Sequence, residues 1–293
     1  MNTSVPNAFT RDIPFSDDDF RSIADLARDR FGLSLAESKK PLVYSRLARR
    51  LKSRQVSSFS DYLALLNRTE EEDERLELIS ALTTNVTSFF RENHHFEIVQ
   101  QVLSQDLAGK ARAGGRLRIW SAGCSSGQEP FSVAMTLLEA IPDAPARDVR
   151  ILATDIDPKI VAKARAGNYS AEDVSGIPAP LRKKWITAND AAGKTYAVAD
   201  ALKSLITFNE LNLMDDWPFA GPFDAIFCRN VAIYFAPDTQ RRLWQRMSAK
   251  LSPGGLLFIG HSERVTGPAL EDLTGVGITS YCKSRTNAQP TLQ

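Results

Sequence analysis

The sequence contains no long hydrophobic run and few cysteines. Among its 293 residues, no apolar stretch approaches the ~20 residues that a helix needs to cross a bilayer, so we expect no direct membrane insertion. The cysteines at positions 124, 228 and 282 are far apart and lack the close spacing of a disulfide framework. Free thiols of this kind favour a cytoplasmic protein.

Histidine is also scarce, and charge of neither sign dominates. His94 and His95 are adjacent and His261 is alone, so their spacing predicts no metal site. Lys and Arg number 36 against 35 Asp and Glu, which gives a formal net charge of +1. This balance argues neither for nor against nucleic acid as a partner.

The most informative segment is Leu117–Pro130, LRIWSAGCSSGQEP. A short apolar run ends in small residues and is followed by apolar positions at helical spacing, which predicts a strand, a tight turn and a helix. Gly123 and Gly127 carry no Cβ and would let the backbone approach a ligand closely. The turn lacks the glycine patterns that bind phosphates. It therefore indicates either a nucleoside cofactor without phosphates, such as S-adenosylmethionine, or an ordinary strand-to-helix turn.

The pattern divides the chain into helical and alternating parts. Residues 16–107 have helical periodicity, with a capping box expected at Thr69–Glu72 and an apolar face that reaches Val86. From Leu117 onward, strands alternate with helices, which predicts a parallel α/β sheet. The expected strands are Leu117–Trp120, Val149–Thr154, Leu205–Asn209, Asp224–Cys228 and Leu256–Ile259.

We expect a helical N-terminal domain over residues 1–75, with a basic helix at about 39–54. A second domain over 76–285 would begin with a linker helix and contain the parallel sheet. Between about 168 and 205, prolines and a short β-like run predict an inserted antiparallel subdomain. Residues 286–293 are polar, which predicts a flexible tail.

Residues suited to binding a nucleoside follow successive predicted strands, and all but Leu213 are polar. The set is Asp155 after the second strand, Asn212 and Leu213 after the third, and Arg229 and Asn230 after the fourth. Ligands of open α/β sheets bind at the carboxyl ends of the strands, where an acid can accept hydrogen bonds from ribose hydroxyls. Each residue also has a simpler interpretation as a turn former, a cap or a surface charge. Together they favour a nucleoside site.

Four longer motifs resemble the chemotaxis receptor glutamate methyltransferases, the CheR family. The resemblance covers residues 16–283. It is carried by Thr83–Glu92 with His95 and Phe96, Ser121–Pro130, Gly221–Val231 with Ile233–Phe235, and Gly254–Glu263.

The resemblance implies a Rossmann-like S-adenosylmethionine-dependent methyltransferase with an all-helical N-terminal domain and a small inserted β-subdomain. The activity it implies is methyl transfer to glutamate side chains of chemoreceptors, which leaves S-adenosylhomocysteine and a glutamyl methyl ester. Cofactor contacts implied by the motifs are Asn85, Thr87, Arg91, Glu129, Asp155, Asn212, Leu213, Arg229 and Asn230.

Other functions remain as alternatives. They are methylation of a different protein or of nucleic acid, and binding of S-adenosylmethionine without turnover. A nucleic-acid methyltransferase would need a motif such as Asn-Pro-Pro-Tyr after the fourth strand, and Arg229–Tyr234 has no such prolines. We therefore expect no nucleic-acid substrate.

A carboxylate nucleophile is already ionised at neutral pH, so the implied reaction needs alignment rather than a general base. Arg91 is the candidate for orienting the substrate carboxylate, and Tyr234 the candidate beside the sulfonium methyl group. The alternatives are a surface helix charge for Arg91 and a core aromatic for Tyr234.

Basic residues form a stripe on the helix expected at Val43–Arg54, with Glu37 the only acid nearby in sequence. The stripe could be a solvated face, a nucleic-acid contact or a dock for an acidic receptor helix, and we favour the last. Its proposed docking residues are Arg46, Arg49, Arg50 and Arg54.

Some members of the family grip a C-terminal receptor peptide through a glycine-rich loop of the β-subdomain. The corresponding segment here, Thr187–Gly193, contains one glycine. We therefore expect no tethering by that peptide, and we expect the protein to act as a monomer.

Overall fold

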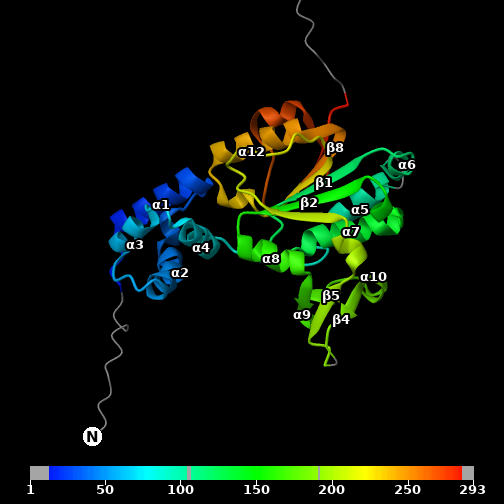
Figure 1. Cartoon of the computed structure of the whole chain (residues 1–293). Coiled ribbons are helices and arrows are strands. Elements are labelled where there is room, and N and C mark those ends of the chain that lie inside the picture. The colour runs from blue at the N-terminus through cyan, green and yellow to red at the C-terminus, as the bar shows by residue number, and fades with distance from the viewer. Residues whose placement is uncertain (1–12, 104–106, 191, 286–293) are drawn as a thin grey trace, which may run out of the picture. The chain divides into compact units, whose positions relative to one another are not determined.

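The computed structural model describes residues 13–103, 107–190 and 192–285, which form two compact units (Figure 1). One unit is Met1–Thr84 and the other is Asn85–Gln293. The flexible tail expected at 286–293 lies outside the described residues. Within the described ranges, no helix combines the length and apolarity required to cross a bilayer.

The first unit consists of helices whose ends follow from local sequence. Ser16 and Asp19 form a capping box at the start of the first helix, and Gly32 ends it with a left-handed φ of 70°. Apolar side chains at helical spacing, among them Ile23, Leu47 and Leu78, are fully buried. The helices are α1 (Asp17–Phe31), α2 (Lys40–Ser53), α3 (Phe59–Leu66) and α4 (Glu72–Leu82), with a 3₁₀ turn at Glu37–Lys39.

Helix α4 corrects two sequence-based expectations. The expected capping box at Thr69–Glu72 is wrong, because α4 begins at Glu72 and the preceding Glu71 makes no side-chain cap. Helix α4 also packs against α2 and α3, so its contacts belong to the first unit. The division therefore falls after Thr84 rather than after residue 75.

Helical structure is interrupted between α4 and α5 (His94–Val102). Residues 83–93 form an irregular segment, so the expectation of helix throughout 16–107 is wrong there. Val86, expected on a buried helix face, is 73% exposed. Phe90 and Glu92 have φ values of 53° and 55°, and this left-handed backbone cannot continue an α-helix.

The second unit is built on a seven-stranded sheet with the order β6-β2-β1-β7-β8-β10-β9. The strands β6, β2, β1, β7 and β8 are parallel, which confirms the predicted α/β fold. Strands β10 and β9, which the sequence did not predict, pair antiparallel at one edge. The bounds are β1 (Leu117–Ala122), β2 (Val149–Asp155), β6 (Ile206–Glu210), β7 (Phe223–Cys228), β8 (Leu251–Ile259), β9 (Leu273–Gly277) and β10 (Ser280–Lys283).

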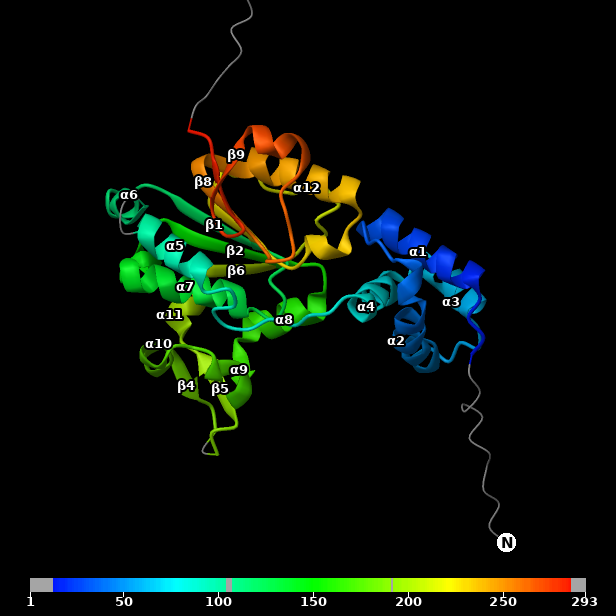
Figure 2. The same cartoon turned by 180° about the vertical axis from the view of Figure 1, so that it is seen from behind.

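Helices cover both faces of this sheet (Figures 1 and 2). Helix α7 packs against α5 and contacts β2 and β6, whereas α12 lies against β8 on the other face. Residues 211–222, which connect β6 to β7, contain no helix. The helices are α6 (Ala108–Arg112), α7 (Gln128–Ala140), α8 (Pro158–Ala166), α11 (Asp200–Lys203) and α12 (Pro237–Lys250).

The antiparallel subdomain predicted within 168–205 is present. Its three short strands have the order β3-β5-β4, and both pairings are antiparallel. The buried Tyr169 anchors the subdomain, because its hydroxyl donates to the Ser126 carbonyl at 2.7 Å. The elements are β3 (Asn168–Ser170), α9 (Ala171–Ser175), α10 (Ala179–Trp185), β4 (Ile186–Ala188) and β5 (Thr195–Val198).

Candidate active site

The carboxyl ends of β6, β2, β1 and β7 lie side by side, because these strands are parallel neighbours. The sheet therefore collects at one edge the segments that follow each strand. This edge contains Asp155, the last residue of β2, and the predicted residues Asn212, Leu213, Arg229 and Asn230 in the segments that follow β6 and β7.

The turn after β1 packs closely against neighbouring segments of the protein. Gly123 has a φ of 77°, and an added Cβ would collide with the Val231 side chain. Gly127 has a φ of 93°, and its Cβ would lie 2.9 Å from that of Ala164. Both glycines therefore allow positive φ and close packing of neighbouring segments, and their close approach to a ligand stays a prediction.

Asp155 ends β2 and is 8% exposed. Its two carboxylate oxygens accept the backbone N–H groups of Ser125 at 2.8 Å and Asp157 at 3.2 Å. Burial raises the pKa of Asp155, while these hydrogen bonds oppose the shift. Each oxygen retains acceptor capacity, so the carboxylate suits a group that donates from two hydroxyls, such as a ribose.

Arg229, directly after β7, is the centre of a buried polar network, and its side chain is 2% exposed. Its guanidinium binds Glu129 on the first turn of α7 at 3.1 Å and donates to the Arg91 carbonyl. The other oxygen of Glu129 accepts from the Ser121 hydroxyl at 2.7 Å. Burial raises the pKa of Glu129 although Arg229 opposes the shift. Arg229 therefore ties the end of β7 to α7 and to the segment before α5.

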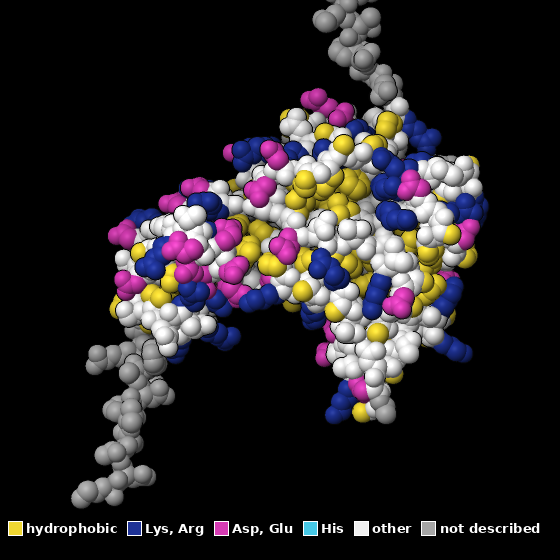
Figure 3. Space-filling model, in the orientation of Figure 1, with side chains coloured by type: hydrophobic (Ala, Val, Ile, Leu, Met, Phe, Trp, Pro, Cys, Tyr) yellow, Lys and Arg dark blue, Asp and Glu magenta, His cyan; other side chains and the backbone are white. Residues whose placement is uncertain are grey.

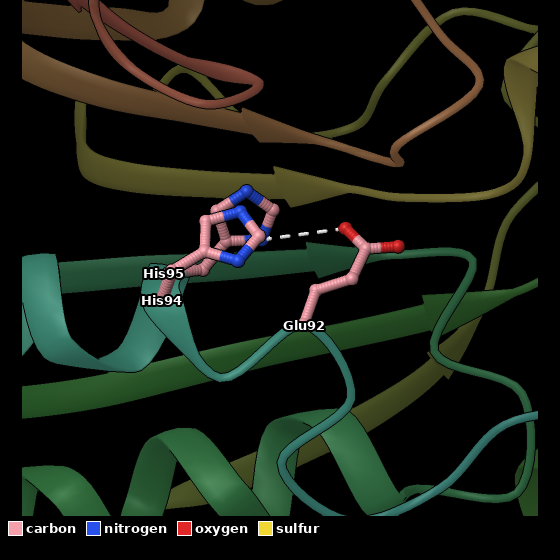
Figure 4. A group of neighbouring side chains, drawn as sticks. All are labelled: Glu92, His94 and His95. Carbon is pink, nitrogen blue, oxygen red and sulfur yellow. Dashed lines mark ion pairs between the residues drawn. The ribbon is translucent and has the colours of Figure 1, made fainter.

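Glu92 lies against the same guanidinium. Burial alone would raise its pKa, but Arg229 at 3.4 Å and hydrogen bonds from His261 outweigh burial and lower it. Figure 4 shows Glu92 facing His94 and His95. One carboxylate oxygen of Glu92 and one ring nitrogen of each histidine, the atoms that could bind a metal, lie within 4.8 Å of one another. Such a group could hold a metal ion. Because the Arg229 cation would repel it, the geometry favours an ion-pair network.

The irregular segment before α5 places three further predicted residues. The Asn85 carbonyl accepts from the Ser125 hydroxyl at 3.2 Å, and Arg91 Nη1 donates to the Val86 carbonyl at 2.9 Å. Thr87 is half-buried in the same segment. Arg91 is therefore a half-buried loop residue within the second unit, not a helix charge.

The remaining predicted positions have local partners. Asn212 Oδ1 accepts the Met214 N–H at 3.0 Å, and Leu213 is buried. Asn230 has a left-handed φ of 59°. Tyr234 is half-buried and ends a 3₁₀ turn, Ala232–Tyr234.

Glu263 is a supporting residue that the sequence did not single out. Its buried carboxylate accepts three backbone N–H groups, from Gly260 at 2.6 Å, Asn230 at 3.0 Å and Ile233 at 3.1 Å. The carboxylate therefore fixes the segment after β7 against the end of β8. Its position in the motif Gly254–Glu263 was the available signal.

In the first unit, the predicted docking stripe on α2 is largely paired with α4. Arg46 donates to the Ala81, Leu82 and Thr83 carbonyls at 3.1, 3.0 and 3.1 Å and so caps the end of α4. Arg50 binds Glu74 at 2.6 Å and Glu77 at 2.8 Å, and Arg54 binds Glu71 at 2.7 Å.

Glu37 is the only acid close to the stripe in sequence, but in the fold Glu74 and Glu77 of α4 and Glu71, just before α4, lie against it. Arg49 is exposed and makes no hydrogen bond or ion pair with the part of the chain that the structure describes.

Comparisons with known proteins agree with this architecture. Residues 85–281 match the family described as CheR methyltransferase, SAM binding domain, and residues 18–83 match CheR methyltransferase, all-alpha domain. A probable chemotaxis protein methyltransferase of Rhizobium etli is 49% identical over 85% of this chain and 94% of its own length.

Two further relatives cover most of both chains. Chemotaxis protein methyltransferase 2 of Pseudomonas aeruginosa is 44% identical over 96% of this chain and 99% of its own. The chemotaxis protein methyltransferase of Escherichia coli is 40% identical over 89% of each. The chain belongs to the CheR methyltransferase family, with its S-adenosylmethionine-binding domain in the second unit.

Proposed function

We propose that this protein transfers a methyl group from S-adenosylmethionine to glutamate side chains in the cytoplasmic helical region of chemoreceptors. The observation that carries the proposal is the contact between Arg229 and the Arg91 carbonyl. This contact holds the segment containing Arg91 at the carboxyl edge of the sheet, beside Asp155 and Glu129. A cofactor site and a group able to orient a carboxylate are thereby neighbours.

The residues at this edge fit the cofactor. The buried Asp155 carboxylate has acceptor capacity for ribose hydroxyls, and Asn212 and Leu213 follow the adjacent strand β6. S-adenosylmethionine supplies an electrophilic methyl group, and transfer to a carboxylate oxygen breaks the carbon–sulfur bond without moving a proton. The protein must therefore align two charged groups and exclude water, and no general base is required.

Arg91 is assigned to orientation of the substrate carboxylate. Its Nη1 atom is occupied by the Val86 carbonyl, which fixes the side chain while other N–H groups of the fork stay available. Tyr234 follows the end of β7 and is assigned to the environment of the methyl group. Both assignments rest on the proposed reaction.

Docking of an acidic receptor helix is assigned to the exposed part of α2. The arginines at 46, 50 and 54 stabilise the packing of α2 on α4. The charges of Arg50 and Arg54 are largely compensated by glutamates, whereas Arg46 donates to backbone carbonyls and keeps its charge. Arg49 and Lys52 are exposed and could attract the acidic helix. We expect the loop with the single glycine, Gly193, not to grip a receptor peptide.

The test is methylation of a purified receptor cytoplasmic fragment with S-adenosylmethionine labelled in the methyl group. Glutamyl methyl esters are base-labile, so the label should be released as methanol by mild alkali. The matched control is a fragment with the methylated glutamates replaced by glutamine. Label that resists alkali, or that appears on nucleic acid instead, would contradict the proposal.

A further inference from the structure

The second unit contains a cavity of about 410 Å³ at the edge of the sheet opposite the candidate active site. Its lining includes the residues at or near the beginnings of β1, β2, β6 and β7. Six strand residues span about 20 Å, so this edge is well separated from Asp155 and Arg229. The polar and aromatic side chains of its lining are those of Arg116, Arg118, Arg150, Thr207, Phe219 and Phe223.

The cavity exists because one crossover lacks a helix. In a doubly wound sheet each parallel crossover normally places a helix on one face. Residues 211–222 connect β6 to β7 as an irregular segment, and its Phe219 packs against Trp120 with ring centroids 5.0 Å apart. This segment covers the sheet only in part. Leu152 and Thr207, near the beginnings of β2 and β6, remain accessible beside it.

One side of the cavity is lined by positively charged arginine side chains. Arg116 donates to the Gly221 and Pro222 carbonyls at 3.2 Å, and Arg150 donates to the Arg147 and Val149 carbonyls at 2.9 and 2.6 Å. These contacts fix both side chains without neutralising them. Among the described residues, no carboxylate pairs with either arginine, whereas Arg118 is paired with Asp148.

The other side of the cavity is aromatic. Phe219 is half-buried, and its ring meets that of Phe223 edge to face at 5.6 Å. Figure 3 shows basic side chains gathered beside hydrophobic ones over β1 and β2, near α6. Two anchored and uncompensated guanidinium groups therefore stand beside a half-buried ring, one side of which stacks on Trp217.

We propose that this cavity binds a nucleoside diphosphate, with the phosphates on Arg116 and Arg150 and the base against Phe219. Guanidinium groups bind phosphate oxygens through paired N–H donors, and aromatic rings stack on any nucleobase. The volume lies within the range of pockets that enclose small molecules. The site is separate from the proposed methyl transfer and does not depend on it.

The test is calorimetric titration of GDP into the full chain saturated with S-adenosylhomocysteine. Saturation keeps the nucleoside out of the proposed cofactor site. We expect saturable binding that weakens about tenfold in Arg116→Ala or Arg150→Ala, because each substitution removes a charge-assisted contact. Arg112→Ala, an exposed arginine outside the cavity, is the matched control and should bind GDP as the wild type does.

A second comparison isolates the aromatic side. Phe219→Ala should weaken GDP while leaving inorganic pyrophosphate unaffected, and thermal unfolding should verify that each variant is folded. Absence of saturable heat at millimolar GDP would overturn the proposal. Equal loss in Arg112→Ala, or pyrophosphate binding as tight as that of GDP, would also contradict it.

Discussion

At the residue scale, burying an ionised carboxylate costs free energy unless hydrogen bonds or an ion pair stabilise its charge. Asp155 is buried, and burial raises its pKa against the effect of two backbone hydrogen bonds. Asp155→Asn should weaken binding of S-adenosylmethionine and S-adenosylhomocysteine by about 10-fold to 100-fold, since a hydrogen bond to a charged group contributes ~1.5–3 kcal/mol. Calorimetric titration of each ligand measures the change.

The control for this experiment is the same substitution two residues later. Asp157 caps α8 by accepting the Lys159 and Ile160 N–H groups. Because asparagine caps helices as well as aspartate does, Asp157→Asn should leave ligand affinity and stability nearly unchanged. Equal affinities of Asp155→Asn and the wild type would remove Asp155 from the cofactor site.

Substitution of Arg91 distinguishes a role in orienting the substrate carboxylate from a role in folding. Arg91→Ala should lower the methylation rate about 100-fold through loss of alignment. Its cost in stability should be within about 0.5 kcal/mol, because the side chain makes a single backbone hydrogen bond. Single-turnover kinetics and urea unfolding measure the two effects. Unaltered turnover would return Arg91 to the role of a surface charge.

Residues that follow strands were predictable individually, but their partners were not. Asp155 and Arg229 were found because the carboxyl end of a parallel strand has a fixed place in the fold. The pairing of Arg229 with Glu129 depends on contacts between residues 100 positions apart, which no local pattern encodes. For the same reason, the pairing of Arg50 with Glu74 and Glu77 of α4 could not be predicted from local patterns.

At the scale of elements, charge reversal should distinguish the arginines of α2 that are paired with glutamates from the exposed Arg49. Arg50→Glu would place a carboxylate against Glu74, which is 1% exposed and also accepts from the Tyr62 hydroxyl at 2.7 Å. Loss of a buried pair costs ~3–5 kcal/mol, so we expect this variant to unfold the first unit readily. Far-ultraviolet circular dichroism measures the helical loss.

Arg49→Glu is the matched reversal on the same helix. Its side chain is exposed and unpaired among the described residues, so helix content and melting should stay close to those of the wild type. Receptor methylation should nevertheless fall, because the docking surface loses its attraction for an acidic helix. Wild-type methylation by Arg49→Glu would refute docking through this face.

Elements whose apolar residues have a strong periodicity were predicted from the sequence, and elements with a weak periodicity were missed. Strand β7 and residues Leu256–Ile259 of β8 are mostly apolar and fully buried, as burial on both faces demands, whereas β6 at the sheet edge alternates buried and exposed residues. Strand β9 contains Gly275 and Gly277, and glycine favours no extended pairing, so its sequence resembles a loop. The irregular segment 83–93 was mistaken for helix because its apolar spacing continues that of α4, while its left-handed residues leave no trace in periodicity.

At the scale of the whole molecule, the two units can be followed separately. The four tryptophans, at positions 120, 185, 217 and 244, all lie in the second unit. Tryptophan fluorescence therefore reports unfolding of the unit that contains the candidate active site. Helix content lost without a fluorescence change would report the first unit.

This separation allows a test of pH dependence in the second unit. His95 is fully buried, and burial, followed by the charge of Arg229, lowers its pKa from 6.5 to about 3. Between these values the unfolded chain binds a proton that the folded chain does not, so the stability present above pH 6.5 is lost as the pH falls. At pH 5 the loss from this one group should be ~2 kcal/mol.

We therefore expect His95→Gln to lose less stability than the wild type when the pH falls from about 7 to about 5, by an amount of that order. Urea unfolding followed by tryptophan fluorescence at each pH measures the difference. His261→Gln removes a histidine whose side chain is 64% exposed, so it is the matched control and should keep the wild-type difference. If His95→Gln and the wild type lose equal stability on acidification, His95 is not the group that stays neutral in the fold, and its contact with the Thr279 hydroxyl at 3.0 Å has a purely packing role.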